Sequence, residues 1–304
     1  MGLYYLYHQH CLAHEMGNSH PEAPARLNSI ENALQQCGLW DAFYHVKAQP
    51  ATQRQLQLAH QTEYLDYVLT HAPSQGYLQL DADTQMNSAS LKAALLAAGS
   101  GPQALDLIAQ GEVQRAFCAM RPPGHHAEHN KAMGFCIFNN IAITALYARQ
   151  QGYERVAIID FDVHHGNGTE NIVAGKDGLW LCSTFQSPLY PFSGEEPLAD
   201  NIFNIPLPAA TGSEDIRTIW REQVIPAIAD YAPDLLLVSA GFDAHQDDPL
   251  AQLNLTDDDY AYFGETLKAQ AQATATGKGI AFLEGGYQLQ ALGRSVAAFL
   301  QNWQ

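Results

Sequence analysis

Short runs of apolar residues alternate along the chain with longer stretches in which apolar positions recur every three or four residues. The short runs predict strands at residues 4–8, 115–120, 156–163, 179–184, 235–241 and 279–283. The longer stretches predict helices near residues 23–37, 89–110, 139–151, 213–230, 257–276 and 288–301. Strands and helices that alternate in this way form a parallel sheet with helices on both faces. The sequence therefore predicts an α/β fold around a central, mostly parallel β-sheet.

The pattern continues through the whole sequence without a natural division. The 304 residues include no internal repeat, no low-complexity tract and no linker long enough to separate two domains. We therefore expect residues 1–304 to form a single domain. One helix boundary is also indicated, because Thr256 precedes three aspartates that suit a helix N-terminus, and Gly277 follows the expected end of that helix.

Composition and charge restrict the classes of function. A net charge of −17 argues against binding to nucleic acid or to an anionic membrane surface, because both require a basic face. The sequence has no apolar stretch of about 18 residues that would span a membrane, and its first residues lack the pattern of a secretory signal. The five cysteines are scattered, which is typical of reduced thiols. We expect a cytoplasmic protein, and the sequence predicts no particular oligomeric state.

The most informative segment is Val156–Gly166, in which an apolar run ends in two acids and two histidines. Side chains alternate along a strand, so we expect Asp160, Asp162 and His164 to point the same way. Two carboxylates and an imidazole are costly to bury unless they are paired or bind a cation. A metal site at the carboxyl edge of the sheet accounts for all three. The alternative is a single structural Asp–His hydrogen bond at the end of the strand.

Three other predicted strands also end in residues that suit chemistry better than packing. One runs into a Pro-Pro-Gly turn that carries His125 and His126, and such a turn can hold two adjacent imidazoles in place. Another is followed by Asp243, and the last by a glycine pair and Tyr287. Each has a plainer interpretation: the paired histidines could be solvated turn residues, Asp243 could cap the next helix, and Tyr287 could be a half-buried aromatic residue. Because these strand ends converge on one edge of the predicted sheet, we favour a functional site.

The residue types at these strand ends indicate hydrolysis of an amide-like carbonyl. Asp162, His164 and Asp243 would supply three metal ligands and leave positions for water and substrate. These ligands suit Zn²⁺, and Fe²⁺, Mn²⁺ and Co²⁺ fit them as well. The metal would polarise the carbonyl and activate a water, one of the paired histidines would act as general base, and Tyr287 would stabilise the oxyanion. No serine or cysteine nucleophile with a base partner is apparent in the sequence, which favours metal-activated water.

In these motifs the chain resembles the zinc-dependent histone deacetylase family, in its class II and bacterial amidohydrolase branch. The matching motifs follow the order of that family and cover most of the chain: His20-Pro21-Glu22 with Arg26, Arg121–Glu128, Gly134–Cys136 with Asn139-Asn140, Asp160–Gly168, Gly241–Leu250 and Glu284–Tyr287. The resemblance implies the arginase–deacetylase fold, with helices on both faces of the sheet. It also implies a zinc ion held by Asp162, His164 and Asp243.

The resemblance assigns roles to further residues. His126 would be the principal general base and acid, and His125 would be an electrostatic partner oriented by Asp160. Class I relatives support the second histidine with an acid, whereas this chain has Asn167 at that position. A neutral partner should leave His126 less basic than a carboxylate would. Tyr287 would clamp the acetyl carbonyl.

A structural K⁺ ion and an apolar substrate channel are implied as well. The K⁺ ligands would come from Asp160, Asp162, His164, Ser183 and the backbone carbonyl of Thr184. The channel walls would include Gly134, Phe135, Tyr190 and Leu250. Two departures concern the shape of the channel rim: Phe185 stands where a histidine is frequent, and residues 190–194 read Tyr-Pro-Phe-Ser-Gly instead of Tyr-Pro-Gly-Thr-Gly.

The substrate would be an acyl-lysine protein or peptide, or a small acylated amine, and other functions stay open. A polyamine-selective branch of the family carries a glutamate where this chain has Leu250, so the leucine favours acyl-lysine over an acetylpolyamine. A silent acyl-lysine reader is disfavoured by Tyr287, because weakly active branches typically carry histidine there. A binuclear manganese ureohydrolase would need a second Asp-x-Asp ligand set, and Asp243 is the only acid in register at its strand end.

Overall fold

The computed structural model describes residues 2–111 and 113–304, and its centre is an eight-stranded sheet in the order β2-β1-β5-β10-β9-β6-β7-β8. All neighbouring strands among these eight run parallel. The strands are β1 (Tyr4–Tyr7), β2 (Tyr44–Lys47), β5 (Arg115–Cys118), β6 (Val156–Asp160), β7 (Leu179–Gln186), β8 (Ile202–Leu207), β9 (Leu235–Ala240) and β10 (Gly279–Leu283). A separate antiparallel pair is formed by β3 (Leu78–Gln79) and β4 (Gln85–Met86).

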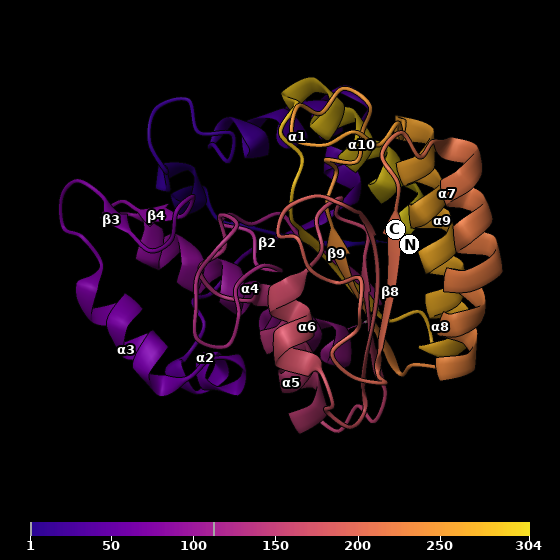
Figure 1. Ribbon diagram of the computed structural model, residues 1–304, viewed down its shortest axis with the longest axis horizontal. Helices are drawn as coiled ribbons and strands as arrows, with labels where there is room; N and C mark the ends of the chain where they lie inside the picture. Colours follow the sequence, from indigo (N-terminus) through magenta and orange to yellow (C-terminus); the bar gives the residue numbers. More distant parts are fainter. Residues whose placement is uncertain (1, 112) are drawn as a thin grey trace.

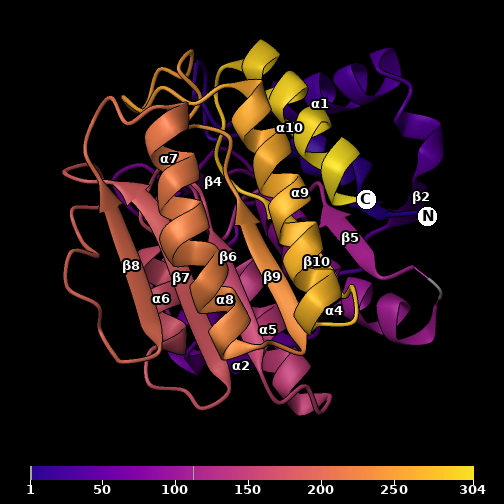
Figure 2. The same cartoon turned by 90° about the vertical axis from the view of Figure 1, so that its right-hand side faces the viewer.

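Helices cover both faces of the sheet. Figure 1 shows α7, α8 and α9 along one side of the strands and α4, α5 and α6 along the other, and Figure 2 shows α7–α10 in front of the sheet. The helices are α1 (Ala25–Gln36), α2 (Gln53–Ala59), α3 (Thr62–His71), α4 (Ser90–Gln110), α5 (Asn140–Gln150), α6 (Asn167–Val173), α7 (Ser213–Ile219), α8 (Ile225–Tyr231), α9 (Asp257–Thr274) and α10 (Leu289–Trp303). Short turns of other helix types are η1 (Gln9–Ala13), η2 (Trp40–Ala42) and η3 (Trp220–Val224). Within residues 2–111 and 113–304, no helix is both long and apolar enough to cross a membrane.

The predicted α/β architecture is confirmed, and all six predicted strands are present. The apolar pattern missed the short strands β3 and β4 and two strands of the central sheet, β2 and β8, which lie at its two edges. Their side chains are partly exposed, and β8 contains Pro206, which breaks the usual strand pattern. Edge strands therefore carry a weaker hydrophobic signal than the buried central strands.

The predicted strand at 156–163 is too long, because β6 ends at Asp160. Asp162 and His164 lie beyond the regular strand, so strand alternation does not explain their orientation. Side-chain acceptors replace the strand ladder there: Asp160 Oδ1 accepts from the backbone N–H of Asp162 at 3.0 Å, and Asp162 Oδ1 accepts from that of His164 at 2.9 Å. The two acids thus fix their own loop as well as the site.

The helix predicted at 213–230 is present but interrupted. Residues Trp220–Val224 form a π-helical turn between α7 and α8. The predicted start of α9 is correct, because Thr256 and Asp259 form a capping box. The N–H of Gly277 bonds the carbonyl of Ala271 just past the end of that helix. Short helices such as α6 were missed, because seven residues give little periodicity.

Candidate active site

Three of the predicted site residues form one buried cluster at the carboxyl edge of the sheet. Asp162 and His164 follow β6, and Asp243 follows the neighbouring strand β9. One ligand atom from each of these residues lies within 4.8 Å of the others. Both aspartates are fully buried, and His164 is 9% exposed. Of the three, His164 is thus the residue that reaches the protein surface.

Backbone N–H groups hold the carboxylates of this cluster. Asp162 Oδ2 accepts from the N–H of Gly285 at 2.8 Å, and Asp243 Oδ1 accepts from the N–H of Val163 at 3.1 Å. Each bond joins the loop after one strand to the loop after another. The positions of the carboxylates are thus set by backbone atoms of several strands rather than by side-chain packing alone.

Two glycines make room for these carboxylates. A Cβ atom at Gly241 would lie 2.1 Å from Asp162 Oδ2, and a Cβ at Gly285 would lie 1.9 Å from Asp243 Oδ2. Real Cβ atoms do not approach oxygen so closely, so any side chain at either position would displace the acids. The glycines of the strand ends therefore shape the cluster by allowing this close approach.

The charges of the cluster fit a bound divalent metal ion. Burial alone would lower the pKa of His164, but hydrogen bonds and charges from Asp162 and Asp243 raise it to about 10. Two buried carboxylates at this distance need a compensating positive charge. Two carboxylate oxygens and one imidazole nitrogen are ligands that divalent transition metals prefer.

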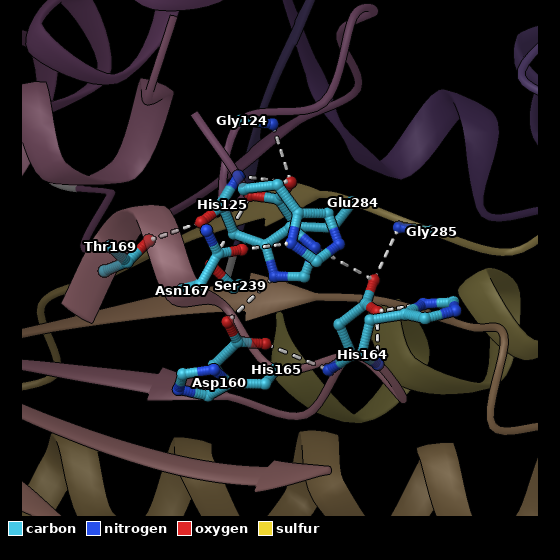
Figure 3. A network of polar contacts seen from close by, with 12 residues as sticks. Gly124, His125, Asp160, His164, His165, Asn167, Thr169, Ser239, Glu284 and Gly285 are labelled. Carbon is cyan, nitrogen blue, oxygen red and sulfur yellow. Dashed lines mark hydrogen bonds and ion pairs between the residues drawn. The ribbon is translucent and has the colours of Figure 1, made fainter. Parts of the chain in front are cut away.

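His125 lies behind the cluster and between two buried acids. Its Nδ1 donates to Asp160 Oδ2 at 3.0 Å, while Glu284 Oε2 accepts from the backbone N–H groups of Gly124 and His125 at 2.7 and 3.1 Å. Figure 3 shows Asp160 and Glu284 on opposite sides of the His125 ring. Burial would lower the pKa of His125, but the charges of Asp162 and Asp160 raise it to about 10. The neighbouring acids therefore favour the protonated form of His125.

His126, the second histidine of the pair, has a neutral partner. Its Nδ1 donates to Asn167 Oδ1 at 2.8 Å, which leaves Nε2 as the free ring nitrogen. Burial and the neighbouring rings of His125 and His164 lower the pKa of His126 well below its usual value. The pKa values of the two adjacent histidines are thus shifted in opposite directions, because their partners differ.

A cavity of about 200 Å³ reaches this part of the molecule from the surface. Its lining consists of Asp83, His126, Gly134, Phe135, His164, Leu189, Tyr190, Leu250 and Tyr287. The Phe135 ring lies edge-on to Tyr287 at 5.8 Å, and the Tyr190 ring lies edge-on to His126 at 5.3 Å. All four residues that the sequence placed along a channel wall line this cavity. Its walls are mainly apolar, and its inner end carries polar groups.

Tyr287 and the turn at Gly134-Phe135 are held by acids that the sequence reasoning missed. Asp83 Oδ1 accepts from the N–H of Gly134 at 3.1 Å, and Phe135 has a φ of 67°. Asp248 accepts from the N–H of Tyr287 at 2.6 Å. Burial raises the pKa of the Tyr287 phenol well above its usual value, so its hydroxyl stays protonated. The composition of Asp81–Thr84, two acids within a polar turn, was the available signal for Asp83.

A sequence profile of the histone deacetylase domain matches residues 20–303. The chain belongs to the histone deacetylase family. It is 35% identical over 304 residues to histone deacetylase 14, chloroplastic, of Arabidopsis thaliana, across 92% of this chain and 71% of that protein. It is 33% identical over 276 residues to the histone deacetylase-like amidohydrolase of Pseudomonas aeruginosa, across 88% of this chain and 72% of that protein. The crystal structure of the HDA15 HD domain superposes with a TM-score of 0.92 at 32% identity, covering 99% of this chain and 88% of that one.

The two departures from the motifs of the histone deacetylase family occupy different places. Phe185 was expected to affect the channel rim, but it is buried against the His165 ring at 4.7 Å and does not line the cavity. Phe192 lies close to Tyr190 in the sequence, is 80% exposed and has a φ of 61°. The departure at residues 190–194 therefore alters the surface near the cavity, whereas the one at Phe185 alters the interior.

The residues expected around a monovalent cation lie on β6, β7 and the loop after β6. Asp160 and Ser183 are register partners on neighbouring strands, and Thr184 follows on β7. Ser183 Oγ is buried and has no hydrogen-bond partner within the described part of the chain. A buried hydroxyl of this kind is normally satisfied by a polar group or an ion.

Proposed function

We propose that this histone deacetylase family member is a metal-dependent amidohydrolase that removes acetyl or related acyl groups from acyl-lysine-like amines. One observation carries the proposal: the mainly apolar cavity is lined by His164, which belongs to the buried cluster with Asp162 and Asp243. The cavity suits an aliphatic stem, and the cluster suits a metal ion beside the carbonyl at the end of that stem. We further propose that the whole chain, residues 1–304, acts as one catalytic domain.

The metal ligands in this proposal are Asp162, His164 and Asp243, with Zn²⁺ favoured by the donor set and Fe²⁺, Co²⁺ or Mn²⁺ as substitutes. When bound, such an ion polarises the acyl carbonyl and lowers the pKa of a coordinated water. The backbone N–H groups of Gly285 and Val163 support this assignment, because they keep the aspartates aimed at a common point.

His126 and Tyr287 carry the remaining chemistry in this proposal. His126 Nε2 takes a proton from the attacking water and later delivers it to the leaving amine, since Nδ1 already donates to Asn167. The Tyr287 hydroxyl donates a hydrogen bond to the carbonyl oxygen as negative charge develops there. His125, held by Asp160, contributes a positive charge next to the reacting atoms.

A structural K⁺ ion is part of the same proposal. The support is the buried Ser183 Oγ together with the adjacent Asp160, whose negative charge would be compensated by a monovalent cation. The other ligands would be Asp162, His164 and the carbonyl of Thr184. An ion there would stiffen the end of β6, from which the metal ligands extend.

The test measures acetate release from an acetyl-lysine peptide by protein that has been stripped with a chelator and reloaded with Zn²⁺. We expect turnover only in the loaded protein. Asp243→Ala should lose both bound metal and turnover, whereas the matched control Asp247→Ala, at an acid 51% exposed, should keep both. A loaded protein that releases no acetate from any acylated amine would refute the enzyme proposal. Binding of the peptide without turnover would instead indicate an acyl-lysine reader.

An acetylpolyamine amidohydrolase is the second candidate, favoured by one observation. Asp83 places a carboxyl group in the cavity lining, where it could meet a distal ammonium group. Leu250, at another point of the lining, offers no such charge. Comparing kcat/KM for acetyl-lysine peptide and acetylspermidine decides between the two. We expect the peptide to be preferred, and activity on the polyamine alone would reverse the substrate assignment.

A further inference from the structure

The side chains of His126, Asn167 and Glu128 form a hydrogen-bonded chain that begins at the histidine proposed as general base. Asn167 Oδ1 accepts from His126 Nδ1 at 2.8 Å, and Asn167 Nδ2 donates to Glu128 Oε1 at 2.8 Å. The amide Nδ2 also lies 3.2 Å from Met133 Sδ. The oxygen and the nitrogen of the Asn167 amide therefore both have partners. Glu128 Oε1 and Met133 Sδ can only accept and so suit only the NH₂ end, whereas an imidazole nitrogen can donate or accept.

A carboxamide can present either its oxygen or its NH₂ group to a neighbouring ring, because the two ends have nearly the same shape. If the Asn167 amide were turned by half a revolution, its oxygen would face Glu128 Oε1, and two acceptors would meet at hydrogen-bond distance. The NH₂ group would then face His126 Nδ1, which would have to accept instead of donate. His126 would carry its proton on Nε2, the nitrogen left to face the cavity.

We propose that Glu128 is a positioning residue that fixes the orientation of the Asn167 amide and thereby the tautomer of His126. This inference rests on the proposed function, in which His126 Nε2 must hold a lone pair to take a proton from water. In this arrangement a carboxyl group acts on the histidine through one intervening amide rather than directly. Hydrogen-bonded outer partners of this kind typically affect turnover by tenfold or more.

The burial of these residues supports a positioning role. His126 and Asn167 are 4% and 8% exposed, so water does not readily replace a lost partner. Glu128 is half-buried, and its backbone is held by Lys131 and by the ring of His60. Its backbone is therefore fixed on both sides of the carboxyl group that meets Asn167. It lines no part of the cavity and has no direct access to a substrate.

Two substitutions of Glu128 separate geometry from charge. Glu128→Gln keeps an Oε1 acceptor for Asn167 Nδ2 and removes the charge, so turnover should stay within about threefold of the parent protein. Glu128→Leu removes the acceptor and leaves the amide free to turn, so kcat should fall by about tenfold with little change in KM. In an Asn167→Leu background, the Glu128→Leu substitution should have no further effect, because its only route to His126 is gone.

A further pair of variants tests the effect of placing two carboxyl groups side by side. Asn167→Asp places a carboxyl group against Glu128, so the single variant should be less active than the double variant Asn167→Asp with Glu128→Gln. Zn²⁺ content and the melting temperature identify any variant that fails to fold or load. Equal turnover of Glu128→Leu and the parent protein, or additive effects of Glu128→Leu and Asn167→Leu, would overturn the proposal.

A second readout does not depend on turnover. Nitrogen-15 NMR of the histidine rings distinguishes an Nδ1–H from an Nε2–H tautomer. We expect His126 to show Nδ1–H in the parent protein and in Glu128→Gln, and a mixture of tautomers in Glu128→Leu. If the parent protein hydrolyses no acylated amine but the tautomers change as expected, the proposed function fails while the positioning role stands. An unchanged Nδ1–H tautomer in Glu128→Leu refutes the positioning role whatever the activity.

Discussion

The carboxyl group of Asp248 accepts a hydrogen bond from the backbone N–H of Tyr287 at a distance of 2.6 Å. The same carboxyl group also accepts from the N–H groups of Gln288 at 3.0 Å and Leu250 at 3.1 Å. One buried acid thus ties the residue proposed to stabilise the oxyanion to a residue of the cavity wall. The N–H of Phe242 also joins these two loops by donating to the carbonyl of Gly285 at 2.9 Å, and Asp248 adds a second connection between them.

Substitution of Asp248 should therefore lower turnover without preventing metal binding. In Asp248→Asn only one of the two side-chain ends can accept, so at least one backbone N–H loses its partner. A buried unpaired N–H costs about 1–3 kcal/mol, and we expect kcat to fall by about tenfold through displacement of Tyr287. The checks are kinetics with an acetyl-lysine peptide and the melting temperature. The neighbouring Asp247→Asn, at a side chain that is 51% exposed, should change neither by much.

Removing the hydroxyl of Tyr287 should reduce turnover far more than it reduces stability. Tyr287→Phe keeps the ring beside Phe135 and below the Arg26 guanidinium, 5.0 Å from the ring centre. Loss of one oxyanion donor typically costs about 10²- to 10³-fold in kcat. Tyr190→Phe is the control, because the proposal uses only the ring of that residue. Steady-state kinetics with metal analysis would contradict the role if Tyr287→Phe retained most of the activity at full metal content.

Metal loading should be visible in stability as well as in activity. A ligand that binds only the folded state raises the free energy of unfolding by about 2.7 kcal/mol at a hundredfold excess over Kd. We expect the melting temperature to rise on addition of Zn²⁺ and to fall on chelation. The rise should vanish in Asp162→Ala, which removes a ligand. An identical rise in that variant would place the stabilising ion elsewhere on the protein.

Stability should decline in mildly acidic solution because of His60. The Nδ1 of this buried residue donates to the carbonyl of Glu128 at 3.0 Å, and its Nε2 accepts from the N–H of Asn139 at 2.9 Å. Burial lowers the pKa of His60 to about 4, although the bond to the Glu128 carbonyl opposes the shift. The unfolded chain, with a pKa near 6.5, binds the proton more readily than the folded protein does. The stabilisation is complete above about pH 6.5 and is lost as the pH falls toward 4.

Denaturant unfolding between pH 4 and 7 measures this effect. His60 should account for a loss of up to about 3 kcal/mol over that range. His60→Gln, which can keep a donor and an acceptor but does not titrate, should show a flatter pH dependence. An equal slope in the parent protein and in His60→Gln would assign the acid sensitivity to other groups.

The sequence predicted the central part of the fold better than its periphery. Strands buried on both faces, such as β6 and β9, are continuous apolar runs and are recognised without structural information. The edge strands and the short helix α6 carry weaker patterns, because their residues face solvent or form only two turns. The end of β6 was overestimated because Phe161 and Val163 extend the apolar pattern into a loop that is also buried.

The candidate site was predictable where residue type defines chemistry and unpredictable where backbone contacts do. Asp162, His164 and Asp243 were identified because acids and histidine at strand ends indicate a metal site. Asp248 and Glu128 were not singled out, because their contribution lies in the atoms they accept hydrogen bonds from. Contacts between residues far apart in the sequence, such as the one from Asp248 to Tyr287, follow from the folded geometry alone.

The position of β10 in the sheet has a consequence for the order in which the protein can be assembled. Although β10 is the last of the eight strands along the chain, it lies between β5 and β9 near the middle of the sheet. During synthesis, the halves of the sheet carrying β5 and β9 therefore cannot join directly and must leave room for one more strand. A nascent chain that lacks residues 279–287 also lacks the N–H of Gly285 that holds Asp162. The active site thus cannot be complete before this segment has been synthesised and has entered the sheet, and a deletion of the segment would remove a central strand instead of an edge strand.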